Sequence, residues 1–278
     1  LPAERNSLIL TYRLYRDSRE RIWRDAFAKN ERRTELYGDA LRRRGAGILP
    51  RPLEDFLDEL IQVERWGGQV YEPDPYLPEY ASLIEQHIQN GNKTQYRQAG
   101  HGGREIVVQV NKDVTIGLPL ASSSIKQLAP LLSYLRYRAN KNDLLVIDEP
   151  EMNLHPESQV KLLEVLAMVV NAGVKVLLTT HSPYFLAHLN NLVQDEEKPT
   201  NIRKKQATSL YLKDPRAFLN MEQVSAYEMQ DRGKEGYQLV SLKDPAFGIR
   251  WDTLSDVSID INNKYFEIYE KGKGSKRA

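Results

Sequence analysis

The sequence contains no cysteine among its 278 residues. This absence excludes disulfide bonds, thiolate nucleophiles and cysteine-bound zinc. Histidine is scarce too, with five residues, so a histidine-rich metal site is not expected. No run approaches the roughly 20 apolar residues that a transmembrane helix needs, and no charged-then-apolar signal segment opens the chain. We therefore expect a cytoplasmic protein that has no membrane partner.

The chain as a whole is nearly neutral, because it has 39 Lys and Arg and 38 Asp and Glu. Arginine is nevertheless concentrated in the first fifty positions, which suggests a contact with phosphates or another partner. A solvated helix face that pairs with nearby carboxylates explains the same pattern equally well, since surface ion pairs contribute little. The arginines concerned are Arg13, Arg16, Arg19, Arg21, Arg24, Arg32, Arg33, Arg42, Arg43 and Arg44.

Composition and spacing divide the chain into three predicted parts. Residues 1–104 form an Arg-rich helical insertion or lid, residues 105–194 an α/β lobe, and residues 195–278 an α+β extension with a basic tail. In the first part, helical spacing over 8–44, 53–66 and 78–90 predicts helices. The chain opens on Leu-Pro rather than Met, so we expect the natural sequence to begin upstream.

The central part has the most regular pattern of the chain. Two short apolar segments, 144–147 and 174–178, are separated by a stretch of helical length, which is typical of a β-α-β unit with parallel strands. The predicted fold class is therefore α/β with a parallel sheet. Other predicted elements are a hairpin over 105–117, helices at 124–139, 156–170, 182–192 and 259–271, a charged surface loop at 194–206, and strands at 209–212, 224–229 and 237–242.

Two adjacent carboxylates, Asp148 and Glu149, follow the first apolar strand. Ligands of open parallel sheets bind beyond the carboxyl ends of the strands. Asp148 there can hold Mg²⁺ through water, and Glu149 can act as general base toward an attacking water. Without further signals, a strand that merely ends in polar surface residues is the alternative interpretation of the pair.

The second strand runs into the sequence TTHSP and thus brings His181 to the predicted edge of the sheet. A neutral imidazole at that edge can donate to a phosphate oxygen or hold the attacking water. The neighbouring hydroxyls of Thr179, Thr180 and Ser182 are further candidate ligands. Because two adjacent strand ends both carry reactive side chains, a shared site is favoured over two unrelated polar ends.

These motifs resemble the ABC-type ATPases of the SMC, RecF and OLD (overcoming lysogenization defect) group. LLVIDEP looks like the Walker B strand and TTHSP like the switch region. By the same resemblance, EMNLHPESQ is the D-loop, with Asn153, Leu154 and His155 facing a partner subunit. The pattern DEPExxLHPxxQ is most similar to stand-alone ATPases of phage-defence systems, and the opening LPAER is similar to a segment that these proteins carry.

The stretch PLASSSIKQLAPLL occupies the place of the family's signature helix. Ser122, Ser123 and Ser124 open a helix, where N–H groups and the dipole favour a phosphate. The family usually has glycine at two of these positions, and a serine run before a helix is often an ordinary N-cap. Its place in the motif order favours the signature interpretation.

No G-x-x-x-x-G-K-[ST] occurs in the sequence, so the loop that wraps the β-phosphate is lacking. The resemblance places that loop in an N-terminal lobe, and hydrolysis is expected only when this lobe is present. The resemblance then implies ATP and Mg²⁺ as ligands, a homodimer or higher homo-oligomer, and an effector protein such as a nuclease, with nucleic acid as a further candidate partner. The expected function is ATP hydrolysis at a composite dimer interface in anti-phage defence. The alternatives are a non-hydrolysing scaffold or sensor and a DNA-repair ATPase of the RecF type.

Overall fold

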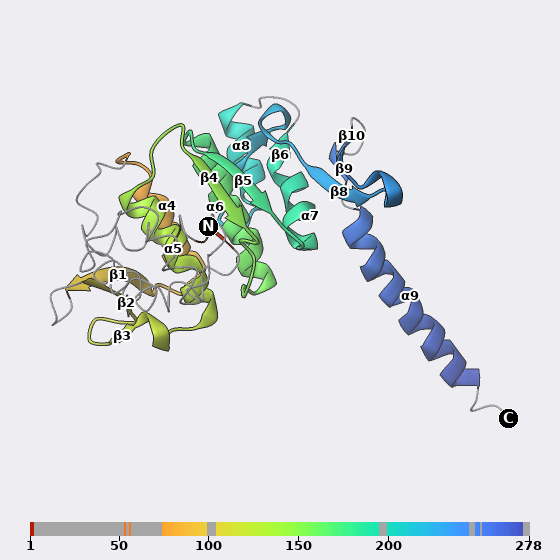
Figure 1. Cartoon of the computed structure of the whole chain (residues 1–278), viewed down its shortest axis with the longest axis horizontal. Coiled ribbons are helices and arrows are strands. Elements are labelled where there is room, and N and C mark those ends of the chain that lie inside the picture. Colours follow the sequence, from red (N-terminus) through yellow and green to blue (C-terminus); the bar gives the residue numbers. More distant parts are fainter. Residues whose placement is uncertain are drawn as a thin grey trace, which may run out of the picture. The chain divides into compact units, whose positions relative to one another are not determined.

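The structure is a computed structural model that describes residues 1–2, 53, 56, 74–98, 104–194, 199–244, 248–250 and 252–274. The chain divides into two compact units (Figure 1). The first unit comprises Leu1–Leu154 and Ala172–Thr179, and the second comprises His155–Asn171 and Thr180–Ala278. The predicted helices over 8–44 and the arginine cluster lie outside the described residues. Of the predicted helix over 53–66, Leu53 and Phe56 are described, and both are helical.

The described elements of the first unit include two α-helices, an antiparallel sheet of order β1-β2-β3 and a parallel pair of strands. The predicted hairpin is confirmed, since β2 pairs with β3 and the Asn111 side chain accepts bonds from the backbone N–H groups of Asp113 and Val114 in the turn. The elements are α4 (Pro78–His87), β1 (Lys93–Gln98), β2 (Arg104–Gln109), β3 (Thr115–Gly117), the 3₁₀ turn η1 (Leu118–Leu120), α5 (Ser123–Tyr137), β4 (Leu144–Asp148) and β5 (Lys175–Thr179).

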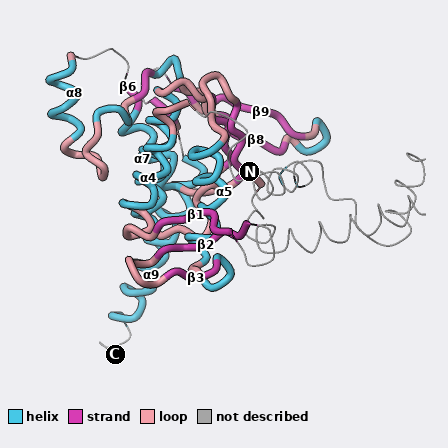
Figure 2. The backbone as a smooth tube through the Cα atoms, turned by 90° about the vertical axis from the view of Figure 1, so that its left-hand side faces the viewer, coloured by secondary structure: helices cyan, strands magenta, loops and turns pink. Residues whose placement is uncertain are grey.

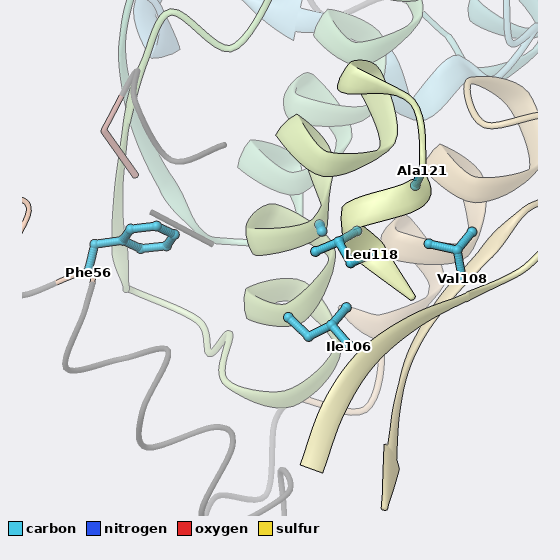
Figure 3. Close-up of a cluster of buried hydrophobic side chains, with 6 residues drawn as sticks. Phe56, Ile106, Val108, Leu118 and Ala121 are labelled. Atoms are coloured by element: carbon cyan, nitrogen blue, oxygen red, sulfur yellow. The ribbon is translucent and has the colours of Figure 1, made fainter. Parts of the chain in front are cut away.

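A cluster of buried apolar side chains joins β2 to the start of α5. Figure 3 shows Ile106 and Val108 of β2 with Leu118, Ala121 and Phe56. Burial of such side chains is the main stabilising contribution to the unit.

A buried ion pair connects α4, β1 and α5. Glu85 of α4 lies 2.9 Å from the guanidinium of Arg136 of α5 and accepts a 2.8 Å bond from the backbone N–H of Thr94. Arg136 also donates to the carbonyl of Thr94. Each charge is thereby both paired and hydrogen-bonded, as burial requires.

Strands β4 and β5 run parallel, as predicted, and Leu144–Asp148 pairs residue by residue with Lys175–Thr179. Leu145 and Ile147 are buried, whereas Leu144 and Val146 on the other face are exposed. The alternation follows from the two-residue period of a strand. The mixed α/β architecture with parallel strand pairing agrees with the predicted fold class.

The second unit is built from helices α6, α7 and α8, short strands and a long C-terminal helix (Figure 2). β6 pairs parallel with β7, β8 antiparallel with β9, and β10 antiparallel with β11. No helix in the described part of the chain is both long and apolar enough to cross a membrane. The elements are α6 (Pro156–Asn171), α7 (Pro183–Leu192), β6 (Val193–Gln194), α8 (Thr200–Ala207), η2 (Pro215–Ala217), β7 (Leu219–Asn220), η3 (Met221–Gln223), β8 (Tyr227–Asp231), η4 (Gly233–Glu235), β9 (Tyr237–Ser241), β10 (Lys243–Asp244), β11 (Gly248–Ile249) and α9 (Asp252–Gly274).

Two local predictions in this unit are wrong. The segment 194–206 is not simply a charged loop, because Thr200–Ala207 forms α8. The segment 209–212 is not a strand but a turn. The N–H groups of Ser209 and Leu210 bind carbonyls of α8, and those of Tyr211 and Leu212 bind a side chain of α6, instead of a neighbouring strand.

That side chain is Glu164, which is fully buried in the second unit. Its carboxylate accepts bonds from the backbone N–H groups of Tyr211 (3.0 Å) and Leu212 (2.8 Å) and from the Nε2–H of His188 (2.8 Å). Two of these bonds come from the turn after α8 and one from α7, so one carboxylate of α6 connects all three segments. Buried carboxylates are tolerated only when donors satisfy them in this way.

We expect Glu164→Gln to destabilise the chain by about 3 kcal/mol, because the new NH₂ group faces N–H donors where an acceptor is required. Equilibrium unfolding in urea would measure this loss. The matched control is Glu157→Gln on the same helix. Glu157 pairs with Lys161 at the surface, so this variant should unfold at the wild-type midpoint. Equal midpoints for both variants would contradict the role assigned to Glu164.

Candidate functional site

The first unit brings Asp148 and Thr179 together at the carboxyl ends of two adjacent parallel strands. The register of β4 and β5 places these two residues directly opposite each other. The Thr179 hydroxyl donates to the Asp148 carboxylate and accepts a 3.2 Å bond from the backbone N–H of Glu149. One hydroxyl therefore orients the carboxylate of one acidic residue and the backbone of the next.

The backbone of Glu149 bends sharply immediately after β4. Its φ of 45° lies in the left-handed region, which costs a non-glycine residue about 1–3 kcal/mol and is concentrated at functional sites. The Glu149 N–H is fixed by the carbonyl as well as the hydroxyl of Thr179. The bend ends the strand ladder, and the bonds from Thr179 hold Glu149 at this edge of the sheet.

The other edge of β4 is occupied by the first residue of the chain. The backbone nitrogen of Leu1 donates to the carbonyl of Val146 (2.6 Å), and its carbonyl accepts from the N–H of Asp148 (2.9 Å). This is the bonding pattern of a parallel bridge. Asp148 is therefore held from both sides, through its backbone by Leu1 and through its side chain by Thr179.

The loop after Glu149 contains the predicted D-loop residues. Asn153 has a φ of 63° and is exposed, whereas Leu154 is only 7% exposed. Of these two, Asn153 is thus the one accessible to a partner. His155, which begins the second unit, is exposed and accepts a 3.3 Å bond from the N–H of Glu157 through its Nδ1.

The predicted signature residues lie at the start of α5. Ser122 is the N-cap: its hydroxyl accepts from the N–H of Ile125 (3.4 Å) and lies 2.9 Å from the hydroxyl of Ser124. Ser123 is exposed beside it. The N–H groups of a first helical turn have no acceptor within the helix, so this end can still receive an anion.

The remaining predicted residues belong to the second unit. His181 is exposed and follows β5 by two residues. Ser182 is buried and caps α7, since its hydroxyl donates to Gln159 Oε1 (2.6 Å) and accepts from the N–H of Phe185 (3.3 Å). Ser182 thus has a structural role, and its contact with a nucleotide stays a prediction.

The residues at the strand ends fit a magnesium ion of the kind that accompanies a nucleotide. No group of three or more His, Cys, Asp or Glu side chains that could hold a metal occurs in the described ranges. Mg²⁺ does not require one, because it binds through one or two carboxylates together with waters and substrate phosphates. Asp148 and Thr179 offer a carboxylate and a hydroxyl for such a site.

Comparison with known proteins finds similarity to ATPases over this region. A family model described as AAA ATPase domain matches residues 53–186. The chain is also 29% identical over 133 residues to the lipoprotein-releasing system ATP-binding protein LolD of Ruegeria sp. (strain TM1040). That match covers 47% of this chain and 58% of the relative, so the chain spans little more than half of the relative's length. These matches agree with the resemblance to ABC-type ATPases that the motifs predicted.

Solved structures with some similarity to the chain include SMC ATPase heads. One comes from a study of ATP-driven dimerization and DNA stimulated activation of SMC ATPases, with a TM-score of 0.38, 12% identity, and coverage of 60% of this chain and 83% of that one. Another is the Smc head domain bound to the C-terminal domain of ScpA derived from Pyrococcus furiosus. Its TM-score is 0.33 at 13% identity, with coverage of 67% and 48%.

The sequence indicated the Thr179 hydroxyl as a candidate ligand but not its hydrogen bond to Asp148. The residue was visible as one of two hydroxyls before His181, but only the strand register shows that it lies opposite Asp148. The left-handed backbone of Glu149 also had no sequence signal, because Gly, Asn and Asp are the usual residues in that conformation.

The geometry of the α5 start predicts different outcomes for two neighbouring serines. Ser122→Ala removes the cap and should lower the free energy of unfolding by about 1 kcal/mol. Ser123→Ala should leave it unchanged, because Ser123 is exposed and does not cap the helix. Thermal and urea unfolding of both variants would measure the difference. If Ser123→Ala were the more destabilising of the two, the cap would be assigned to the wrong residue.

Proposed function

We propose that the chain binds and hydrolyses ATP at a site shared between two subunits. In this proposal Asp148 holds Mg²⁺, Glu149 is the general base, and His181 contacts the γ-phosphate or the attacking water. The observation that supports it best is the Thr179 hydroxyl, which fixes both acidic residues at the end of a parallel strand pair. Such an edge is where parallel sheets bind their ligands.

Hydrolysis requires a water to attack the γ-phosphorus while a base accepts its proton. Glu149 suits this role, since its backbone is held by Thr179 while its side chain stands beyond the strand end, only partly buried. The proton would move from the water to the Glu149 carboxylate as the bond to ADP breaks. Mg²⁺, when bound, would neutralise charge on the phosphates.

The partner subunit would complete the site. Ser122, Ser123 and Ser124 would present the start of α5 to the γ-phosphate of the neighbouring subunit, and Asn153 and His155 would lie at the subunit interface. The exposure of Ser123, Asn153 and His155 agrees with this role. The P-loop would come from outside these 278 residues, because no such motif occurs within them.

We expect Glu149→Gln to lower ATP turnover at least about 100-fold while ATP binding is retained. The measurement uses a longer protein that also contains the P-loop. The amide keeps the shape of the side chain but cannot accept a proton from water. ATP-stabilised dimers should then accumulate, and sedimentation velocity with and without ATP would detect them.

The matched comparison is Ser123→Arg, which places a bulky cation where the partner's phosphate would lie. This variant should neither form ATP-dependent dimers nor hydrolyse ATP, although it folds normally. Mixing the two variants should restore association, since one of the two sites then has an intact signature. Wild-type turnover by Glu149→Gln would remove Glu149 from the proposal, and turnover by monomeric Ser123→Arg would remove the shared site.

We further propose that ATP hydrolysis is coupled to an effector protein or nucleic acid in anti-phage defence, and that the protein is cytoplasmic. The support for this coupling is the DEPExxLHPxxQ pattern together with the ATPase family model that matches residues 53–186. A non-hydrolysing scaffold is favoured by one observation: the signature position carries serines, one of which serves as a helix cap. The turnover measurement separates the two functions, because a scaffold would bind ATP without releasing phosphate.

A further inference from the structure

The second unit contains a cavity that the ATPase proposal does not use. Its volume is about 530 Å³, and its walls come from α6, α7, β6, α8 and the turn that follows α8. The polar and aromatic lining includes Tyr184, His188, Asn191, Gln194, Gln206 and Tyr211. All of these residues belong to the second unit.

One wall of the cavity is held rigidly by the buried Glu164. The Glu164 carboxylate accepts from His188 Nε2, and the Nδ1 of the same ring lies 3.2 Å from the side-chain nitrogen of Asn191. His188 also packs edge-on against Tyr211, with ring centroids 5.7 Å apart. The positions of His188, Asn191 and Tyr211 are thereby set before any ligand arrives, which favours binding.

A buried amide in the cavity lacks part of its hydrogen bonding. Gln194 is 9% exposed and donates through Nε2 to Gln206 Oε1 at 3.2 Å. Its Oε1 has no hydrogen-bond partner within the described part of the chain. Because a buried polar atom without a partner is unfavourable, a ligand in the cavity that donates a hydrogen bond to this amide oxygen would offset the cost.

The walls also indicate that the ligand is flat and uncharged. Tyr184 and Tyr211 line the cavity and are about half exposed, at 50% and 52%. No Lys, Arg, Asp or Glu is among the residues that line it in the described ranges. Tyrosine rings with amide and hydroxyl groups beside them suit a nucleobase, which stacks through its faces and offers donors and acceptors at its edges.

Positive charge stands next to this neutral cavity. Gln206 of the lining belongs to α8, whose preceding residues are Arg203, Lys204 and Lys205. Arg203 lies one helical turn before Gln206 and so shares its face, and its buried Nε has no partner among the described residues. A phosphate attached to the base would meet these cations.

We infer that this cavity binds a nucleobase, whose attached phosphate is contacted by α8. The base enters between the tyrosines, and one of its amino or imino groups donates to Gln194 Oε1. Two sources offer this chemistry: an unpaired base of a single-stranded nucleic acid, and a free nucleotide. The site has no residue in common with the proposed hydrolytic site, so the two proposals can fail independently.

The test is a fluorescence anisotropy titration of the full chain with a labelled ten-nucleotide single-stranded DNA and with an abasic strand of equal length. The strand with bases should bind at least about tenfold more tightly, since stacking of a base on an aromatic side chain contributes on that order. Tyr184→Ala and Gln194→Met should each weaken its binding about tenfold and leave the abasic strand unaffected. Tyr227→Ala is the matched control, because Tyr227 is 59% exposed on β8 and does not line the cavity.

Competition with adenosine monophosphate distinguishes a free nucleotide from an unpaired base of a single-stranded nucleic acid as the ligand. Displacement of the strand at comparable concentrations would assign the cavity to free nucleotides, whereas displacement only by unlabelled strands would assign it to nucleic acid. Equal affinity for the abasic strand would overturn the inference. So would wild-type binding by both Tyr184→Ala and Gln194→Met, or no binding of any of these ligands. Glu149→Gln should bind like the wild type, which separates this result from the ATPase proposal.

Discussion

The proposed function depends on the hydrogen bond between Thr179 and Asp148. Parallel strands in register end at the same edge, so a residue that follows one strand is brought beside a residue of the other. Here that pairing joins a hydroxyl to a carboxylate and, through the same hydroxyl, fixes the backbone of Glu149. If the strands were shifted by one residue, Thr179 would face away from Asp148, because side chains alternate between the faces of a sheet.

The elements around this edge could be predicted from the sequence because local physics determines them. The apolar segments of β4 and β5, and the Pro and Ser residues at the starts of α5, α6 and α7, are short-range signals. The Asp-Glu pair likewise lies where the apolar segment of β4 ends, whereas the role of His181 stays a prediction. What could not be predicted was the bond from Thr179, since it depends on an exact register between residues 31 positions apart.

The errors of prediction arise where distant contacts override local pattern. β1 has mostly polar residues and only Thr94 buried, so its pairing with β2 leaves no apolar alternation to recognise. α8 is rich in charge and buries a single residue, Ala207, and therefore resembled a loop. The segment 209–212 has the composition of a strand, but its last two N–H groups bind Glu164, which lies 47 and 48 residues away. The cavity beside Glu164 had no sequence signal for the same reason.

The role of the Thr179 hydroxyl is tested most directly by the rate of a single turnover of ATP in Thr179→Val and Thr179→Ser, measured in a longer protein that also contains the P-loop. Valine has the shape of threonine but cannot bond to Asp148 or Glu149, so the rate should fall about 10- to 100-fold, as is typical for groups that position a metal ligand. Serine keeps the hydroxyl and should restore most of the rate, with both variants equally stable. A valine variant that hydrolyses ATP at the wild-type rate would contradict the claim that this hydroxyl organises the site.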